Sequence, residues 1–290
     1  MMKIRSLGKV YLVGAGPGAV DLITVRGAKL LEQADIVFHD ALVDPAMLEL
    51  CPQAIKESVG KRCGKLSSAQ HFINKRLIDA AKKYHTIIRL KGGDPMMFGR
   101  ADEEIQALKN HRIEVEVVPG ITAALAGAAA IQQSLTLRGV SRSVAFITLA
   151  QGAENTSSST DENSQPLASP NADTLVYYMG RKDTKKIAKQ LISKYNSNHS
   201  RDTPIHILEA VSTKNERHWS STLGELAEGK ADGWFDRASP ALIMIGKALT
   251  EIQQIPIQIT KTSNLLESSS TKINDSLQDS LILTNCRRSA

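Results

Sequence analysis

The chain has 290 residues, of which 42% are hydrophobic and only 4% aromatic, and its formal net charge is +6. This length exceeds one typical domain and suits two domains with aliphatic cores. The sequence contains no apolar run long enough for a membrane helix, no signal-peptide hydrophobic region behind its basic start, and no basic helix or aromatic-basic platform for nucleic acid.

Short apolar runs alternate with segments of helical periodicity in the first part of the chain. The runs predict buried strands at 9–13, 35–39, 86–90 and 115–118. Apolar residues spaced three and four apart predict helices between them, beginning near Leu22, Phe72 and Ile105. Strand and helix in alternation favour an α/β fold with a parallel sheet.

The pattern restarts after the stretch PGIT at 119–122. A helix of small residues follows, and strands are predicted at 143–150, 174–179, 204–209 and 241–246, with an amphipathic helix at 182–195. The sequence therefore predicts two α/β domains with mostly parallel sheets, at 1–119 and 120–250. Residues 152–172 are expected to form a flexible loop, and residues 251–290 a low-complexity, largely disordered tail.

The chain has three cysteines, Cys51, Cys63 and Cys286. Their number is odd, and no pair has the spacing of metal ligands or of a redox motif. Free thiols of this kind fit a reducing compartment, so the sequence predicts a cytoplasmic protein without a metal site.

Three glycine-rich stretches follow predicted strands. They are Gly14-Ala15-Gly16-Pro17-Gly18, Gly92-Gly93-Asp94-Pro95 and Pro119-Gly120-Ile121-Thr122. Glycines at the carboxyl ends of parallel strands let a ligand approach the backbone, and the Asp94 carboxylate is suited to a ribose or an amino group. A dinucleotide site is an alternative for the first stretch, although Pro17 removes an amide that a pyrophosphate would use. Three unrelated structural turns are the other alternative.

Taken together and in this order, the motifs resemble those of the tetrapyrrole methylases. The matching stretches are VYLVGAGPGAVDLITVRGAKLLEQADIVFHDALV (10–43), VGKRCGK (59–65), RLKGGDPMMFGRADEE (89–104), VEVVPGITAALAGAAA (115–130) and TLVYYMG (174–180). The resemblance covers about residues 9–250. It implies a cleft between two α/β domains that binds S-adenosylmethionine and releases S-adenosylhomocysteine. The cofactor contacts that it implies are Pro17, Gly92, Gly93, Asp94, Met97, Thr122, Ala123, Met179 and the region of Val211.

The resemblance also implies the reaction, which is methylation of uroporphyrinogen III at two pyrrole carbons to give precorrin-2 for sirohaem or cobalamin. It assigns Asp40 as proton acceptor and Lys61 as proton donor. From its position after a strand alone, Asp40 is better interpreted as a turn or cap residue, and Lys61 and Arg62 are also interpretable as ligands of substrate carboxylates. The positive charge fits a solvated surface or a polyanionic small molecule. The cations expected to face the eight substrate carboxylates are Lys61, Arg62, Arg89, Lys91, Arg100 and Arg138.

Further expectations follow from the resemblance and from departures from the family pattern. A homodimer is expected, with a separate protein as the downstream dehydrogenase and chelatase. Ala101, Asp102 and Leu137 replace two glycines and a histidine of the usual motifs. Val211 stands where glycine is usual, and a β-branched residue there is expected to affect the backbone. The alternatives are another precorrin methyltransferase, a cofactor-binding but inactive relative, and a dinucleotide-dependent oxidoreductase.

Overall fold

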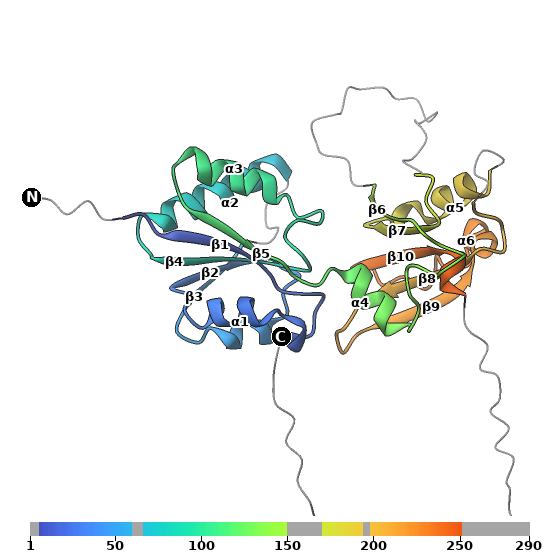
Figure 1. Cartoon of the computed structure of the whole chain (residues 1–290), viewed down its shortest axis with the longest axis horizontal. Helices are drawn as coiled ribbons and strands as arrows, with labels where there is room; N and C mark the ends of the chain where they lie inside the picture. Colours follow the sequence, from blue (N-terminus) through green and yellow to red (C-terminus); the bar gives the residue numbers. More distant parts are fainter. Residues whose placement is uncertain (1–5, 60–65, 150–169, 194–197, 251–290) are drawn as a thin grey trace, which may run out of the picture. The chain divides into compact units, whose positions relative to one another are not determined.

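The computed structural model describes residues 6–59, 66–149, 170–193 and 198–250. Within them lie two five-stranded sheets, and contacts group residues 1–251 into one unit that contains both (Figure 1). The predicted tail at 251–290 and residues 152–169 of the predicted loop lie outside the described residues. The domain boundary near residue 119 stays a prediction.

The first sheet is entirely parallel, with strand order β3-β2-β4-β1-β5. Its strands are β1 (Lys9–Gly14), β2 (Ile36–His39), β3 (Ile55–Ser58), β4 (Thr86–Lys91) and β5 (Val115–Val118). Its helices are α1 (Val25–Leu31), α2 (Leu66–Ala81) and α3 (Ala101–Asn110), with short 3-10 helices η1 (Val20–Leu22) and η2 (Pro45–Leu50). The parallel sheet that the alternating pattern predicted is confirmed here.

Alternate residues of each strand serve the two faces of this sheet. Val10 and Leu12 of β1 pack with α2 and α3, whereas Val13 packs with Leu31 of α1 and with η2. Figure 1 shows α2 and α3 on one face and α1 on the other. Because both faces are covered, the strands read as continuous apolar runs in the sequence.

The second sheet has the order β6-β7-β10-β8-β9 and is mixed. Its strands are β6 (Val144–Thr148), β7 (Thr174–Tyr178), β8 (Pro204–Glu209), β9 (Arg217–Thr222) and β10 (Ala241–Gly246). Its helices are α4 (Ala123–Ala130), α5 (Thr184–Ile192) and α6 (Leu223–Glu228), with 3-10 helices η4 (Arg181–Asp183) and η5 (Lys247–Leu249). Apolar residues of α5 and α6 cover one face, and the alanines of α4 cover the other.

The α/β fold class is confirmed, but the expectation of a mostly parallel second sheet was wrong. Only β6 and β7 pair in parallel, while β10 pairs antiparallel with β7 and β8, and β8 pairs antiparallel with β9. The link between β8 and β9 is too short for the crossover of about a dozen residues that a parallel pair needs. β3 and β9 were not predicted, because these edge strands are largely polar and give no apolar run.

Candidate functional site

The three glycine-rich stretches follow β4, β1 and β5, which are neighbours in the first sheet. Their backbones are joined directly. Gly93 N donates to Gly16 O at 2.7 Å, and Gly16 N donates to Gly93 O at 3.2 Å. Both glycines have positive φ, 78° at Gly16 and 68° at Gly93, which a residue with a Cβ rarely adopts. The glycines are therefore required by this junction of two loops.

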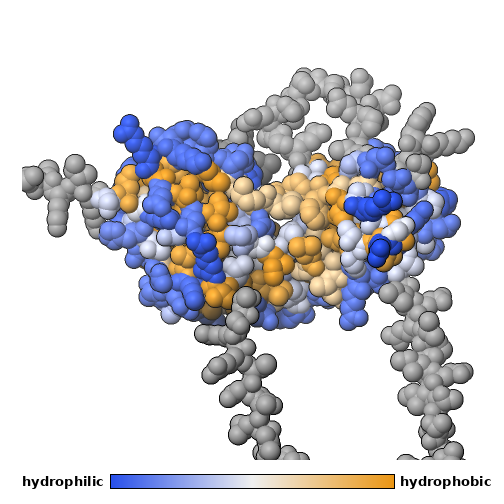
Figure 2. Space-filling view, in the orientation of Figure 1, coloured by the Kyte–Doolittle hydropathy of each residue, from blue (hydrophilic) through white to orange (hydrophobic). Residues whose placement is uncertain are grey.

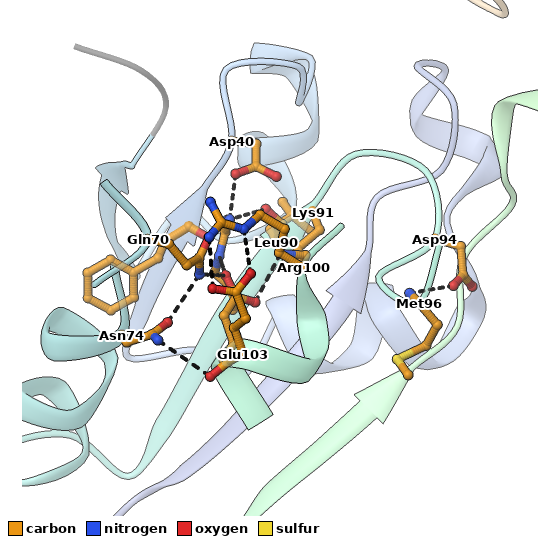
Figure 3. A network of polar contacts seen from close by, with 12 residues as sticks. Asp40, Gln70, Asn74, Leu90, Lys91, Asp94, Met96, Arg100 and Glu103 are labelled. Carbon is orange, nitrogen blue, oxygen red and sulfur yellow. Dashed lines mark hydrogen bonds and ion pairs between the residues drawn. The ribbon is translucent and has the colours of Figure 1, made fainter. Parts of the chain in front are cut away.

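Asp94 joins the third stretch to the other two. Its Oδ2 accepts a hydrogen bond from Gly120 N at 2.9 Å, and its Oδ1 accepts one from Met96 N at 2.7 Å. A Cβ atom at Gly120 would lie 2.2 Å from Gly93 O. The backbones of the three stretches are thus packed so closely that only glycine fits at Gly120. Figure 3 shows Asp94 turned toward Met96.

A loop after β8 approaches the first glycine stretch. Ser212 Oγ accepts a hydrogen bond from Ala19 N at 3.0 Å, and a Cβ atom at Gly18 would lie 2.5 Å from Thr213 Cγ2. The expected effect of Val211 on this loop has a specific form. Positive φ occurs at its neighbours, 49° at Ala210 and 62° at Ser212, while Val211 has none and is buried among residues of the α4 core. Ala210 and Ser212 therefore adopt the left-handed backbone conformation, and the side chain of Val211 packs into the core beneath α4.

Tyr178 at the end of β7 connects further predicted cofactor contacts. Its Oη accepts from Ala124 N at 3.2 Å and shares a hydrogen bond of 2.6 Å with Thr122 Oγ1. Its ring meets Phe98 edge-on, with 5.1 Å between centroids. Burial raises the pKa of the Tyr178 phenol, so it remains a neutral donor. The hydroxyl supplies a cap at the start of α4 that the Thr122 side chain does not provide.

The space beside these groups is compatible with a bound cofactor. A Cβ atom built at Gly93 would have a single neighbour within 4 Å, Thr122 Cα at 4.0 Å, so the surroundings of this glycine are not crowded. Met179 is 55% exposed although it is apolar, and its φ is 55°. Pro17, Gly92 and Met97 are partly buried on the glycine-rich loops, and Ala123 is partly buried at the start of α4. Exposed backbone beside an apolar methionine suits an adenosine group.

Asp40 follows β2, the neighbour of β4, and so lies at the same edge of the sheet. Its Oδ1 accepts from Arg89 Nη2 at 2.5 Å, and its side chain is 31% exposed. The structure thus places the predicted proton acceptor beside the glycine-rich junction. Lys61, the predicted proton donor, and Arg62 lie outside the described residues.

The cations expected to face the substrate are placed in different environments. Arg89 and Lys91 are 2% and 3% exposed and both bind Glu104, so the expectation that they meet substrate carboxylates was wrong. A charge on a central strand must be neutralised inside the protein. Arg100 precedes α3 as its N-cap, has φ 54° and binds Glu103 Oε1 at 2.5 Å. Arg138 is exposed.

Five further residues organise this region, although none was assigned a role from the sequence: Gln70, Phe98, Glu104, Tyr178 and Ser212. All except Ser212 lie in or beside stretches that matched the family pattern, which was the available signal. Burial and pairing were not readable from the sequence. None of the helices in the described part of the chain combines the length and the hydropathy of a membrane-spanning segment.

Comparisons with known proteins agree with the fold and the motifs. The family model for Tetrapyrrole (Corrin/Porphyrin) Methylases matches residues 9–227. The chain is 40% identical over 257 residues to a Pseudomonas aeruginosa protein named uroporphyrinogen-III C-methyltransferase. The aligned region covers 87% of this chain and 99% of that relative. It is 39% identical to the siroheme synthase of Psychrobacter cryohalolentis, over 85% of this chain and 45% of the relative. The chain spans about half the length of the siroheme synthases that it matches.

Two solved methyltransferase structures also align with most of the chain. A uroporphyrin-III C-methyl transferase from Thermus thermophilus, complexed with S-adenyl homocysteine, aligns with a TM-score of 0.66 at 34% identity, over 83% of this chain and 93% of that one. A cobalt precorrin-4 methyltransferase, CbiF, aligns with a TM-score of 0.66 at 28% identity, over 84% of this chain and 96% of that one.

Proposed function

Because the chain belongs to the tetrapyrrole methylase family, we propose that it catalyses S-adenosylmethionine-dependent C-methylation of uroporphyrinogen III at two pyrrole carbons, giving precorrin-2 for sirohaem or cobalamin. The observation that carries this proposal is the glycine-rich junction of three neighbouring strand ends, with Asp40 directly after the next strand, β2. The identity of 40% to a relative named uroporphyrinogen-III C-methyltransferase supports the choice of substrate.

The cofactor is proposed to lie against the junction. Gly92, Gly93 and Asp94 would border it from β4, Pro17 and Met97 from the adjacent loops, and Thr122, Ala123, Met179 and Val211 from the second sheet and α4. When bound, S-adenosylmethionine supplies an electrophilic sulfonium methyl group and leaves as S-adenosylhomocysteine. The loops would hold that methyl group in line with the attacking carbon, and positioning of this kind lowers the barrier substantially.

Two side chains are proposed to move protons. When a pyrrole carbon bonds to the methyl group, the carbon–sulfur bond breaks and its electron pair stays on sulfur. The macrocycle then carries a positive charge, which is neutralised when a proton leaves it. Asp40 is proposed to accept that proton and Lys61 to donate one elsewhere on the ring, as general base and general acid.

Arg62, Arg100 and Arg138 are proposed to bind carboxylates of the substrate. Uroporphyrinogen carries eight carboxylates, and guanidinium groups bind carboxylates through paired hydrogen bonds. The exposed position of Arg138 and the partial exposure of Arg100 beside α3 support this role, because both side chains are accessible to a large anion.

A turnover assay tests the proposal. Purified protein, S-adenosylmethionine and freshly prepared uroporphyrinogen III are mixed without oxygen, and the product mass and absorbance are followed. Addition of two methyl groups is the expected result. S-adenosylhomocysteine binding without methylation would instead favour a different precorrin, as the likeness to a cobalt precorrin-4 methyltransferase suggests, or an inactive relative. Binding of a nicotinamide dinucleotide in its place would overturn the proposal.

The proposal also covers the oligomeric state of the protein, its compartment and the protein that acts after it. We propose a homodimer in the cytoplasm, with the dehydrogenase and chelatase steps on another protein. Exposed Leu125 and the neighbouring small residues of α4 leave apolar surface for a second copy, and Figure 2 shows moderately apolar surface in that region. Cys51 is a free thiol, in keeping with a reducing compartment. Sedimentation that shows only monomer at micromolar concentration would refute the dimer.

A further inference from the structure

Arg89 is a charged residue in the interior of a parallel sheet. Its side chain is 3% exposed, and its guanidinium reaches two carboxylates at once. Nη2 lies 2.5 Å from Asp40 Oδ1, and Nε lies 3.0 Å from Glu104 Oε1. Nη1 donates to Leu90 O at 3.1 Å. Nη1 also donates to Phe38 O at 3.5 Å, so Arg89 is held by four partners, one of which is the proposed proton acceptor, Asp40.

Glu104 fixes the far side of that guanidinium. Its side chain is 0% exposed, Oε2 binds Lys91 Nζ at 2.9 Å, and Oε1 also accepts from Gln70 Nε2 at 3.3 Å. Gln70 in turn donates to Asn74 Oδ1 at 3.1 Å. α2, α3 and β4 thus all contribute to one buried network, in which Glu104 leaves Arg89 a single orientation.

Asp40 is the end of this network that reaches solvent, since its side chain is 31% exposed and those of Arg89, Glu104 and Lys91 are at most 4% exposed. The four charges alternate and cancel. Burial, followed by the charge of Arg89, lowers the pKa of Lys91, whereas the carboxylates of Glu104 and Asp40 outweigh burial and raise the pKa of Arg89. Arg89 is thereby kept as a permanent cation beside Asp40.

Stability alone explains this arrangement poorly. Buried ion pairs are often no more stabilising than well-packed apolar residues of the same volume, because desolvation offsets their attraction. An apolar pair at these positions would also cover the sheet. An apolar pair would lack a hydrogen-bond donor such as the Arg89 guanidinium, which is fixed at the sheet edge and points to the partly exposed carboxylate of Asp40.

We infer that Arg89 is a positioning residue for Asp40, and that Glu104 acts through Arg89 by fixing its guanidinium. The inference rests on the proposed function, in which Asp40 accepts the proton released by the methylated ring. A fixed guanidinium binds Oδ1 of Asp40, and Oδ2, which has no partner among the described residues, can then face the substrate. Lysine cannot replace it, because a single ammonium does not offer the planar fork that spans two carboxylates.

The test compares Arg89→Lys and Glu104→Gln with wild type in the methylation assay. Both variants are expected to lower kcat about 10- to 100-fold, since small misplacements of a reacting group cost about that much. KM for uroporphyrinogen III and the Kd for S-adenosylhomocysteine are expected to stay within about twofold, because neither residue is placed on the cofactor loops. Arg201→Lys and Glu228→Gln, at an exposed pair 2.6 Å apart, are matched controls and are expected to keep wild-type kcat.

A double-mutant cycle separates positioning from a general structural role. Glu104→Gln is expected to lower kcat in the wild-type background but to have little further effect on the residual rate of Asp40→Asn, because it then has no acceptor to position. An equal fractional loss in both backgrounds would overturn the inference, as would wild-type kcat in Arg89→Lys.

Gln70→Met serves if Glu104→Gln does not fold. It removes one donor to Glu104 and leaves all four charges in place, so a smaller loss of kcat supports the inference and an unchanged kcat overturns it. Failure of the proposed function is distinguished by wild type itself, which would then not methylate uroporphyrinogen III. In that case the crystal structure of the Gln70→Met variant decides: an Asp40 carboxylate displaced from its wild-type position supports the inference, and an unmoved one overturns it.

Discussion

The backbone amide of Gly120 donates a hydrogen bond to Oδ2 of Asp94, 2.9 Å away, and so one carboxylate ties the end of β4 to the end of β5. Asp94 was expected to contact a ligand. Its two oxygens also hold the loops that would form the cofactor site, which makes it a structural element of that site.

Asp94→Asn is expected to weaken both the site and the fold. An asparagine has one acceptor oxygen and would turn its NH2 toward one of two backbone donors, leaving Gly120 N or Met96 N unpaired. We expect a loss of about 1–3 kcal/mol in the free energy of unfolding and weaker S-adenosylhomocysteine binding, measured by urea unfolding and calorimetry. Asp44→Asn is the control, because Asp44 caps Ala46 N at 2.9 Å in the same way on η2. Equal binding by the two variants would contradict the prediction.

Gly120→Ala is expected to disrupt the junction. Its Cβ would lie 2.2 Å from Gly93 O and 2.8 Å from Gly14 Cα, so the backbone must move. Overpacking of this kind costs about 1–3 kcal/mol, and we expect cofactor binding to fall with it. Gly233→Ala, where a Cβ meets nothing within 4 Å, should leave both unfolding and binding close to wild type. A wild-type Kd in Gly120→Ala would show that the loops adapt.

Tyr178→Phe tests the link between β7 and the start of α4. The variant keeps the ring contact with Phe98 but leaves Ala124 N without its acceptor and Thr122 without its hydrogen-bond partner on Tyr178. We expect the free energy of unfolding to fall by about 1–3 kcal/mol, measured by urea unfolding. Tyr11→Phe on β1 controls for removal of a phenol hydroxyl. A larger loss in Tyr11→Phe than in Tyr178→Phe would refute this assignment.

Val211→Gly restores the residue usual in the family and is nevertheless expected to destabilise the protein. Val211 is 6% exposed and packs with the α4 core, while positive φ falls on Ala210 and Ser212. Losing a buried valine side chain costs about 1.5–3 kcal/mol. Urea unfolding checks the loss, and calorimetry with S-adenosylhomocysteine checks whether the loop needed the glycine. A Val211→Gly variant with higher stability and higher affinity than wild type would contradict this account.

His199 predicts a dependence of stability on pH. Burial lowers the pKa of His199 below its usual 6.5. Nε2 donates to Ala172 O at 3.1 Å, and Nδ1 has no hydrogen-bond partner among the described residues. The unfolded chain therefore binds a proton that the folded chain resists, so stability is full above pH 6.5 and falls as the pH drops below it. Urea unfolding between pH 5 and 8 measures this slope. His199→Gln should reduce it, and an unchanged slope would assign it to other groups.

The sequence by itself determined much of this protein. The apolar runs predicted eight of the strands, because strands covered on both faces must be apolar. Gly16, Gly93 and Gly120 were recognisable because glycine adopts positive φ without steric cost and, lacking a Cβ, allows two backbones to approach closely. The order of the motifs along the chain was enough to suggest the family.

The tertiary structure decided the rest, because pairing and burial depend on residues far apart in the sequence. Only the strand order β4-β1-β5 showed that the three glycine stretches meet. The antiparallel pairing of β10 with β7 and β8 was not encoded in local periodicity, which is the same for either direction. From the sequence, Arg89 and Lys91 were predicted to bind the substrate. In the structure both are buried against Glu104, which neutralises their charges. A sequence gives the charge of a side chain, and the fold decides whether water, a ligand or another side chain balances it.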